Sequence, residues 1–261
     1  LERIKETGDI FMAWSDNPWV LEGAAVRVSV IGFDDGSQTS KILDGSPTFT
    51  INSDLTGSID LTKSFRLPEN IGIAYSGTKK GGPFEISREQ ALSFIQMSNS
   101  MSSRNNKDVI KPWINGREII GRPQNIWIVD FGNRNEKQAS EYEKPFEYVK
   151  EHVLPIRMQN RRTTRRDRWW LHSELAPALK KGLANLTRYI ATPRVSKHRI
   201  FVWADKDAVP DDGTYALLRS DDYFFGVLHA RPHDLWALRM GTSLGPTPRY
   251  TPTTTFETFP F

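Results

Sequence analysis

The sequence of 261 residues lacks cysteine altogether. This absence excludes a disulfide scaffold, a thiolate zinc site and a cysteine nucleophile, and it fits a reducing cytoplasm. Long apolar runs are missing too, because no stretch approaches the roughly 18 residues that cross a bilayer. Glycine-rich nucleotide loops of the GxGxxG or P-loop type are absent as well. We therefore expect a cytoplasmic protein with no membrane partner and with no cofactor held by this chain.

Two groups of residues invite a metal-binding interpretation. His229 and His233 are four apart, a spacing that places two side chains on one face of a helix. Pro232 disturbs such a helix and no third ligand is nearby, so structural or surface roles are favoured. Six aspartates between positions 205 and 222 resemble a nuclease's metal carboxylates, but they stand in turn-like sequence, which favours a solvated loop. We expect no metal site and no catalytic residue in this chain.

Positive charge is concentrated in one segment, although the net charge is only +4. Residues 157–199 hold twelve lysines and arginines but only two acids, Asp167 and Glu174, so they carry +10 while the rest carries −6. A basic segment on an acidic body is the footprint of a polyanion-binding surface. Acids are too few near RRTTRRDR (161–168) to pair with its arginines. The favoured partner is nucleic acid, and an acidic protein is the alternative.

Strands and helices occur without regular alternation, which predicts an α+β fold. Apolar and polar residues alternate over 24–33, as in a half-buried strand, and the composition becomes polar after Phe33, where we place a domain boundary. Ser87 and Gln90 form a capping box that predicts the start of a helix. Further elements are expected as a strand at 126–131, helices at 137–158 and 169–187, and strands at 188–193 and 199–204.

Some residues in these elements carry more than one interpretation. The loop TKKGGPF (78–84) is basic and flexible, and its pair Gly81–Gly82 either approaches a phosphate through bare amides or forms a plain turn. Trp169, Trp170 and Trp236 lie on apolar stripes, which favours core packing over base stacking. Pro145 is tolerated in the helix at 137–158 only near its start or at a kink.

Several segments resemble one known family in the family's own order. Residues 8–33, GDIFMAWSDNPWVLEGAAVRVSVIGF, resemble the last stretch of an N6-adenine DNA methyltransferase catalytic domain. The rest resembles the target recognition domain of MmeI-like type II restriction–modification enzymes. The matching segments are NKDVIKPWINGREI (106–119), RPQNIWIVDFG (122–132), RRDRWWLHSE (165–174), RYIATPRVSKHRIF (188–201), DYFFGVLHARPHDLW (222–236) and RYTPTTTFETFPF (249–261).

This resemblance implies a mixed-sheet DNA target recognition domain at 34–261, preceded at 1–33 by the last strands of a Rossmann-like methyltransferase domain. The partners implied are double-stranded DNA and a methyltransferase catalytic domain in the same chain, within the bacterial cytoplasm and nucleoid. The catalytic tetrapeptide and the S-adenosylmethionine motif would precede Leu1, so we expect a fragment that is not catalytic alone. Its parent would be a site-specific adenine-N6 methyltransferase, which would also need Mg²⁺ if an endonuclease were fused to it.

The resemblance also assigns roles to particular side chains. In relatives, the turn after Pro-Arg-Val-Ser helps to decide one position of the recognised site, and the base-reading set here is Ser196, Lys197, His198 and Arg199. We expect Lys197 and Arg199, two apart at a strand edge, to point the same way and to read a G·C pair. DNA phosphates would be bound by Arg161, Arg162, Arg165, Arg166, Arg168, Arg194, Lys79 and Lys80. The alternative is a catalytically silent module that binds nucleic acid or an acidic protein in a bacterial defence complex.

Overall fold

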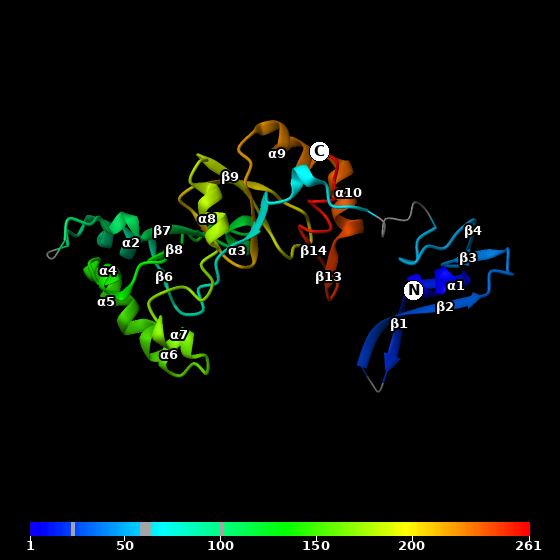
Figure 1. The fold of residues 1–261 in the computed structure, drawn as a ribbon, viewed down its shortest axis with the longest axis horizontal. Helices are drawn as coiled ribbons and strands as arrows, with labels where there is room; N and C mark the ends of the chain where they lie inside the picture. Colours follow the sequence, from blue (N-terminus) through cyan, green and yellow to red (C-terminus); the bar gives the residue numbers. More distant parts are fainter. Residues whose placement is uncertain (22–23, 58–63, 100–101) are drawn as a thin grey trace. The chain divides into compact units, whose positions relative to one another are not determined.

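The computed structural model describes residues 1–21, 24–57, 64–99 and 102–261. The chain divides into two compact units, Leu1–Phe65 and Arg66–Phe261 (Figure 1). The division therefore lies further along the chain than the boundary predicted after Phe33. The polar stretch that follows Phe33 belongs to the first unit because Ile51 and Leu55 are buried in one small core with Ile10 and Ala13.

The first unit is built on a long β-ribbon. Its elements are α1 (Glu2–Thr7), β1 (Asp9–Leu21), β2 (Ala24–Asp34), β3 (Lys41–Leu43) and β4 (Ser46–Thr48). The sheet order is β2-β1-β3-β4, with β1 antiparallel to β2 and parallel to β3. The strand predicted over 24–33 is thus confirmed. Trp19, Val20, Leu21 and Phe33 are each more than half exposed, so the ribbon presents large apolar side chains on its surface.

The second unit mixes helices and strands, which confirms the α+β class. Its first part contains η2 (Pro68–Asn70), β5 (Ala74–Ser76), β6 (Glu85–Ile86), α2 (Arg88–Gln96), η3 (Asn106–Asp108), β7 (Ile110–Ile114), α3 (Gly116–Ile120), β8 (Trp127–Val129), α4 (Glu136–Ser140), α5 (Glu143–His152), α6 (Leu154–Met158) and α7 (Thr163–Asp167). Its second part contains α8 (Pro177–Leu183), β9 (Arg188–Pro193), β10 (Val202–Asp205), β11 (Val209–Pro210), β12 (Thr214–Leu217), α9 (Asp222–His229), α10 (Arg231–Met240), β13 (Thr242–Leu244) and β14 (Thr247–Arg249). Among the described residues, no helix is long and apolar enough to span a membrane.

Two four-stranded sheets organise the second unit, in the orders β11-β7-β8-β6 and β10-β9-β12-β5. Strand β9 lies between two antiparallel partners, and its alternate residues enter two different cores. Tyr189 and Ala191 pack with Leu179 and Leu183 of α8, whereas Ile190 packs with the apolar side chains of α9 and of the C-terminal segment. Figure 1 shows α6 and α7 at one end of this unit, and α10 with the hairpin β13–β14 at the other.

The core around β6, β7 and β8 contains two of the predicted core tryptophans. Trp169 and Trp170 are 7% and 8% exposed, and both pack in this core. Trp169 also lies against Phe146, at 5.3 Å between ring centroids. The capping box at Ser87 and Gln90 is present at the start of α2, as predicted.

Two predicted helices are broken in the structure. The range 137–158 divides into α4, α5 and α6, because a new helix starts at Glu143 with Pro145 in its first turn and another starts at Leu154 before Pro155. The prediction of one helix over 169–187 is correct only for Pro177–Leu183. Ala176 adopts the left-handed conformation, at φ 46°, and Pro177 then begins α8.

Two predicted strands are shorter than expected. Only Trp127–Val129 forms a strand within 126–131, and the strand predicted at 199–204 runs from Val202 to Asp205. Phe201, just before that strand, is buried in the core with Tyr250 and Leu228 instead of pairing along β9. Residues 194–201 therefore form a longer connection between β9 and β10 than the sequence indicated.

Candidate nucleic-acid interface

The turn between β9 and β10 is fixed by its backbone. The amide of Arg194 donates to the carbonyl of Gly213 at 2.7 Å, and the amide of Ser196 donates to Pro248 at 3.2 Å. The carbonyl of Arg194 accepts from the amide of Tyr250 at 2.8 Å. These bonds tie the turn to the segment before β12 and to β14. Its shape is therefore set by the fold and not by solvent.

The four side chains predicted to read bases divide into two pairs. Lys197 and His198 are exposed. Ser196 is only 6% exposed, and its hydroxyl donates to the carbonyl of His198 at 2.7 Å. Arg199 is partly buried and directed inward. The structure thus brings the four residues together in one turn but offers two of them, Lys197 and His198, to a partner.

Arg199 is held by three groups of the protein itself. Its Nη1 donates to the hydroxyl of Thr192 at 3.0 Å and to the carbonyl of Pro193. Its guanidinium carbon lies 4.9 Å from the centre of the Tyr250 ring. Burial lowers the pKa of Arg199 to about 10, which leaves the side chain charged at neutral pH. Because β10 begins only at Val202, the strand alternation that placed Lys197 and Arg199 on one side does not apply.

His233 supports the contact between Arg199 and Tyr250 by bonding to Tyr250. It is fully buried, and its Nδ1 donates to the carbonyl of Leu228 at 3.0 Å. Its Nε2 then accepts from the hydroxyl of Tyr250 at 3.2 Å. Burial lowers the pKa of His233 to about 4, so the ring is neutral. The structural role expected for His233 is confirmed.

The predicted phosphate-binding arginines lie on and around α7. Arg161, Arg162 and Arg168 are exposed, while Arg165 and Arg166 are partly buried. Across the described ranges of the chain, no carboxylate forms an ion pair with any of the five. Arg166 donates to the carbonyl of Asn160 at 2.8 Å. The segment therefore presents guanidinium groups whose charge the fold leaves uncompensated.

A buried arginine joins this segment to the glycine loop, and the sequence reasoning missed its role. Arg157 is 1% exposed, and its Nη2 donates to the carbonyl of Lys80 at 2.8 Å and to that of Leu171 at 2.9 Å. Burial lowers the pKa of Arg157. Its position could have been found from its spacing, because Val149, Val153 and Arg157 follow at steps of four along one helical face.

The glycine loop is packed and not open. A Cβ atom at Gly81, which has a φ of 66°, would lie 1.9 Å from Ser173 Oγ. The backbone of Lys79 exchanges two hydrogen bonds with Glu174, each of 3.1 Å. The side chain of Lys79 is about half exposed and lies 3.9 Å from a carboxylate oxygen of Glu174 and 3.8 Å from one of Asp212, and Lys80 forms an ion pair with Glu85. Packing therefore requires the glycines. Of the two interpretations of this loop, a phosphate-binding loop or a plain turn, the packing favours the plain turn.

Arg194, the last of the predicted phosphate ligands, is partly engaged by the protein. Its Nη2 donates to the hydroxyl of Ser76 at 2.7 Å, and its guanidinium carbon lies 5.2 Å from the centre of the Tyr215 ring. It belongs to the turn and lines a cavity together with Lys80. Two of the predicted phosphate ligands, Lys80 and Arg194, therefore lie near each other, whereas five arginines lie on and around α7.

Comparison with known proteins identifies the family to which this chain belongs. The family model of the MmeI target recognition domain matches residues 76–261, which is most of the second unit. The chain belongs to the MmeI target recognition domain family. Membership in this family implies DNA sequence recognition in a restriction–modification enzyme. The comparison with curated protein sequences finds no match.

A solved structure shares the fold of this MmeI-type domain. It is described as the type IIL restriction–modification enzyme MmeI in complex with DNA, and it is similar at a TM-score of 0.71 with 18% sequence identity. The match covers 99% of this chain and 36% of that protein, so the chain spans about a third of its length. The similarity therefore includes the first unit, which the family model does not match.

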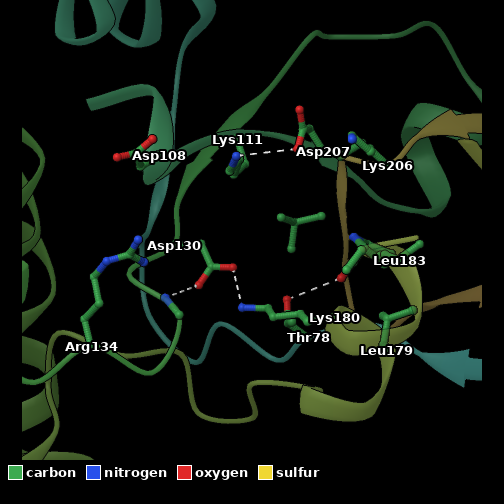
Figure 2. Close-up of a pocket in the computed structure, with 15 residues that line it drawn as sticks. Thr78, Asp108, Lys111, Asp130, Arg134, Leu179, Lys180, Leu183, Lys206 and Asp207 are labelled. Carbon is green, nitrogen blue, oxygen red and sulfur yellow. Dashed lines mark hydrogen bonds and ion pairs between the residues drawn. The ribbon is translucent and has the colours of Figure 1, made fainter. Parts of the chain in front are cut away.

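The MmeI-type domain also contains a cavity of about 340 Å³ away from the turn, lined by Lys111, Asp130, Lys180 and Asp207 among others. Lys180 points to Asp130, with 2.6 Å between Nζ and Oδ2 (Figure 2). Lys111 lies 3.7 Å from Asp207. Burial alone would raise the pKa of Asp130, but the neighbouring His172 and Lys180 outweigh it and hold the pKa at about 2. The carboxylates are thus neutralised by cations of the chain.

The glycine loop does not fit S-adenosylmethionine, and the described histidines and acids do not fit a metal ion. The space in front of Gly81 and Gly82 is filled by Ser173, Val153 and Arg157, so this loop offers no cradle for a cofactor. No group of three or more His, Asp or Glu able to hold a metal occurs in the part of the chain that the structure describes. The aspartates at 205–222 serve the fold instead, for example where Asp221 caps α9 by accepting from the amide of Phe224 at 2.9 Å.

Proposed function

We propose that this chain recognises duplex DNA by sequence, as the recognition module of a bacterial adenine-N6 methyltransferase in a restriction–modification enzyme. The observation that carries the proposal is the turn between β9 and β10, where a fixed backbone presents Lys197 and His198 outward in an MmeI-type target recognition domain. Rigid presentation matters because base recognition needs side chains placed accurately within a groove.

Lys197 and His198 supply the base contacts in this proposal. The ammonium of Lys197 can donate to the O6 and N7 acceptors of guanine, a contact worth about 1–3 kcal/mol of discrimination. We therefore infer a G·C pair at the position that the turn reads. Ser196 and Arg199 act as positioning residues, since their polar groups are bonded within the turn.

The exposed arginines around α7 supply the sequence-independent part of the affinity. Their charge is unpaired within the described chain, and DNA phosphates would compensate it. Contacts of this kind fix the position of a protein on the duplex but carry no sequence information. Arg161, Arg162 and Arg168 are the most accessible of them.

We further propose that the first unit belongs to a catalytic part in a longer protein. The exposed apolar side chains of β1 and β2, such as Trp19 and Phe33, support packing against a further domain. When bound to that domain, S-adenosylmethionine supplies the methyl group. The residues of the present chain would bind and orient the duplex while the target adenine leaves the base stack. A fused endonuclease, with its Mg²⁺, is compatible with this organisation.

Selection from a pool of randomised duplexes tests DNA recognition directly. The chain of residues 1–261 should enrich one short motif, and its affinity should fall steeply with salt. Enrichment of RNA over duplex DNA, or binding without any motif, would instead favour the silent binding module. For the parent, expression in a methylation-free bacterial host followed by modification-sensitive sequencing should reveal N6-methyladenine in the same motif.

A further inference from the structure

A cavity of about 480 Å³ lies beside the turn, between the turn, helices α9 and α10, and strand β14. Its lining is strongly cationic. Lys197 and Arg199 come from the turn, Arg231 from α10 and Arg249 from β14, while Asp234 is the acid among the lining residues. The cavity therefore carries a surplus of positive charge next to the residues that we propose to read bases.

The partners of these cations show which of them remain available. Arg199 is held by Thr192, Pro193 and Tyr250, as described above. Arg231 pairs with Asp234 at 2.7 Å, but its side chain is 72% exposed, and an exposed pair of this kind contributes little. Arg231 can therefore exchange this partner for an external anion.

Arg249 indicates an anion-binding role for the cavity more specifically than Arg231 does. Its Nε is buried without a hydrogen-bond partner among the residues that the structure describes, and no ion pair to Arg249 is found there. Because Arg249 lines the cavity without a carboxylate partner in the described part of the chain, an anion in the cavity would compensate the charge of its guanidinium group. The backbone of Arg249 is bridged to Val195 in the turn, so its side chain keeps a defined position relative to Lys197.

We propose that this cavity binds one phosphodiester group of duplex DNA beside the base pair that the turn reads, with Arg249 and Arg231 as its ligands. The inference rests on the proposed function and adds a phosphate site whose lining does not include the arginines of α7. One guanidinium group can donate two parallel hydrogen bonds to two oxygens of the same phosphate. Arginine ligands therefore favour a phosphate group over an anion that has only one acceptor atom. A phosphate held there would fix the register of the turn along the groove.

Salt titration of binding to a mixed-sequence duplex tests the site, with Arg231→Gln and Arg249→Gln combined in the chain of residues 1–261. Losing one phosphate contact should lower the log–log slope by about 0.9. The motif selected from randomised duplexes should stay the same, because the contact carries no sequence information. Arg88→Gln, at an exposed arginine on α2 outside the cavity, is the matched control and should keep the wild-type slope.

The outcomes separate this inference from the function on which it rests. An unchanged slope in a variant that still binds DNA would overturn the phosphate site alone, and so would a changed motif. Failure of the wild-type chain to bind duplex DNA would overturn the proposed function. If the double variant unfolds, Arg231→Gln alone decides, since its exposed side chain is not needed for folding. Arg249→Lys, which keeps the charge, should retain the wild-type slope.

Discussion

Arg199 lies over the ring of Tyr250, with 4.9 Å between the guanidinium carbon and the ring centroid. The hydroxyl of Tyr250 donates in turn to His233 on α10. Through these two contacts the turn that follows β9 is anchored to a helix and to the C-terminal segment. This anchoring explains why Lys197 and His198 face outward while Arg199, only one residue further along, does not.

Replacing Arg199 by lysine should weaken the anchoring without removing the charge. A lysine cannot reproduce the guanidinium's bonds to Thr192 and Pro193 together with its stacking on Tyr250. We expect Arg199→Lys to lower the free energy of unfolding by about 1–3 kcal/mol, measured by urea denaturation. DNA affinity should fall while the selected motif stays the same. A new base preference in this variant would show that Arg199 itself contacts a base.

Arg157→Met tests the buried link between α6 and the glycine loop. Methionine can occupy most of the space, but it leaves the carbonyls of Lys80 and Leu171 without their donor. We expect a loss of about 2–4 kcal/mol in the free energy of unfolding. Arg161→Met, at an exposed position nearby, should change stability by about 0.5 kcal/mol or less. Equal effects of the two substitutions would contradict the role given to Arg157.

Stability should fall as the pH drops from 6.5 towards 4. His233 has a pKa of about 4 when folded, below its ordinary value of 6.5, so the unfolded chain binds a proton in this window that the folded chain does not. The contribution is present above pH 6.5 and is lost as the pH falls. Burial also lowers the pKa of His172, which acts in the same direction.

The corresponding experiment compares urea unfolding at pH 7 and pH 4.5. His233→Gln should reduce the stability lost on acidification by about 2 kcal/mol, because glutamine does not titrate there. Gln159→Ala, at an exposed residue that does not titrate, should keep the wild-type dependence. If His233→Gln loses as much stability on acidification as the wild type, the assignment of a neutral buried ring is wrong.

Local patterns predicted those features whose cause is local. The capping box at Ser87, the alternation in β2 and the buried strand β9 each depend on neighbouring residues, and all were found as expected. The helix expected at 169–187 failed because the backbone of Glu174 bonds to Lys79, far away in sequence. Helical spacing of leucines could not reveal that competing contact.

The candidate site shows the same difference between features with a local cause and features that depend on contacts distant in sequence. The charge map identified RRTTRRDR correctly as uncompensated, since pairing depends largely on how many acids are nearby. The inward direction of Arg199 could not be predicted, because its partner Tyr250 lies on a distant segment that only the tertiary fold brings close. For the same reason, the cavity between the turn, Arg231 and Arg249 has no signature in the sequence.

The most direct test of the account is motif selection by Lys197→Glu beside the wild-type chain, with Lys181→Glu as a control of equal charge change at an exposed residue of α8. A glutamate at the turn accepts from cytosine N4 instead of donating to guanine. The account predicts that Lys197→Glu alters the preferred base pair at one position only, whereas Lys181→Glu selects the wild-type motif. An unchanged motif from Lys197→Glu would contradict the claim that this turn reads the DNA sequence.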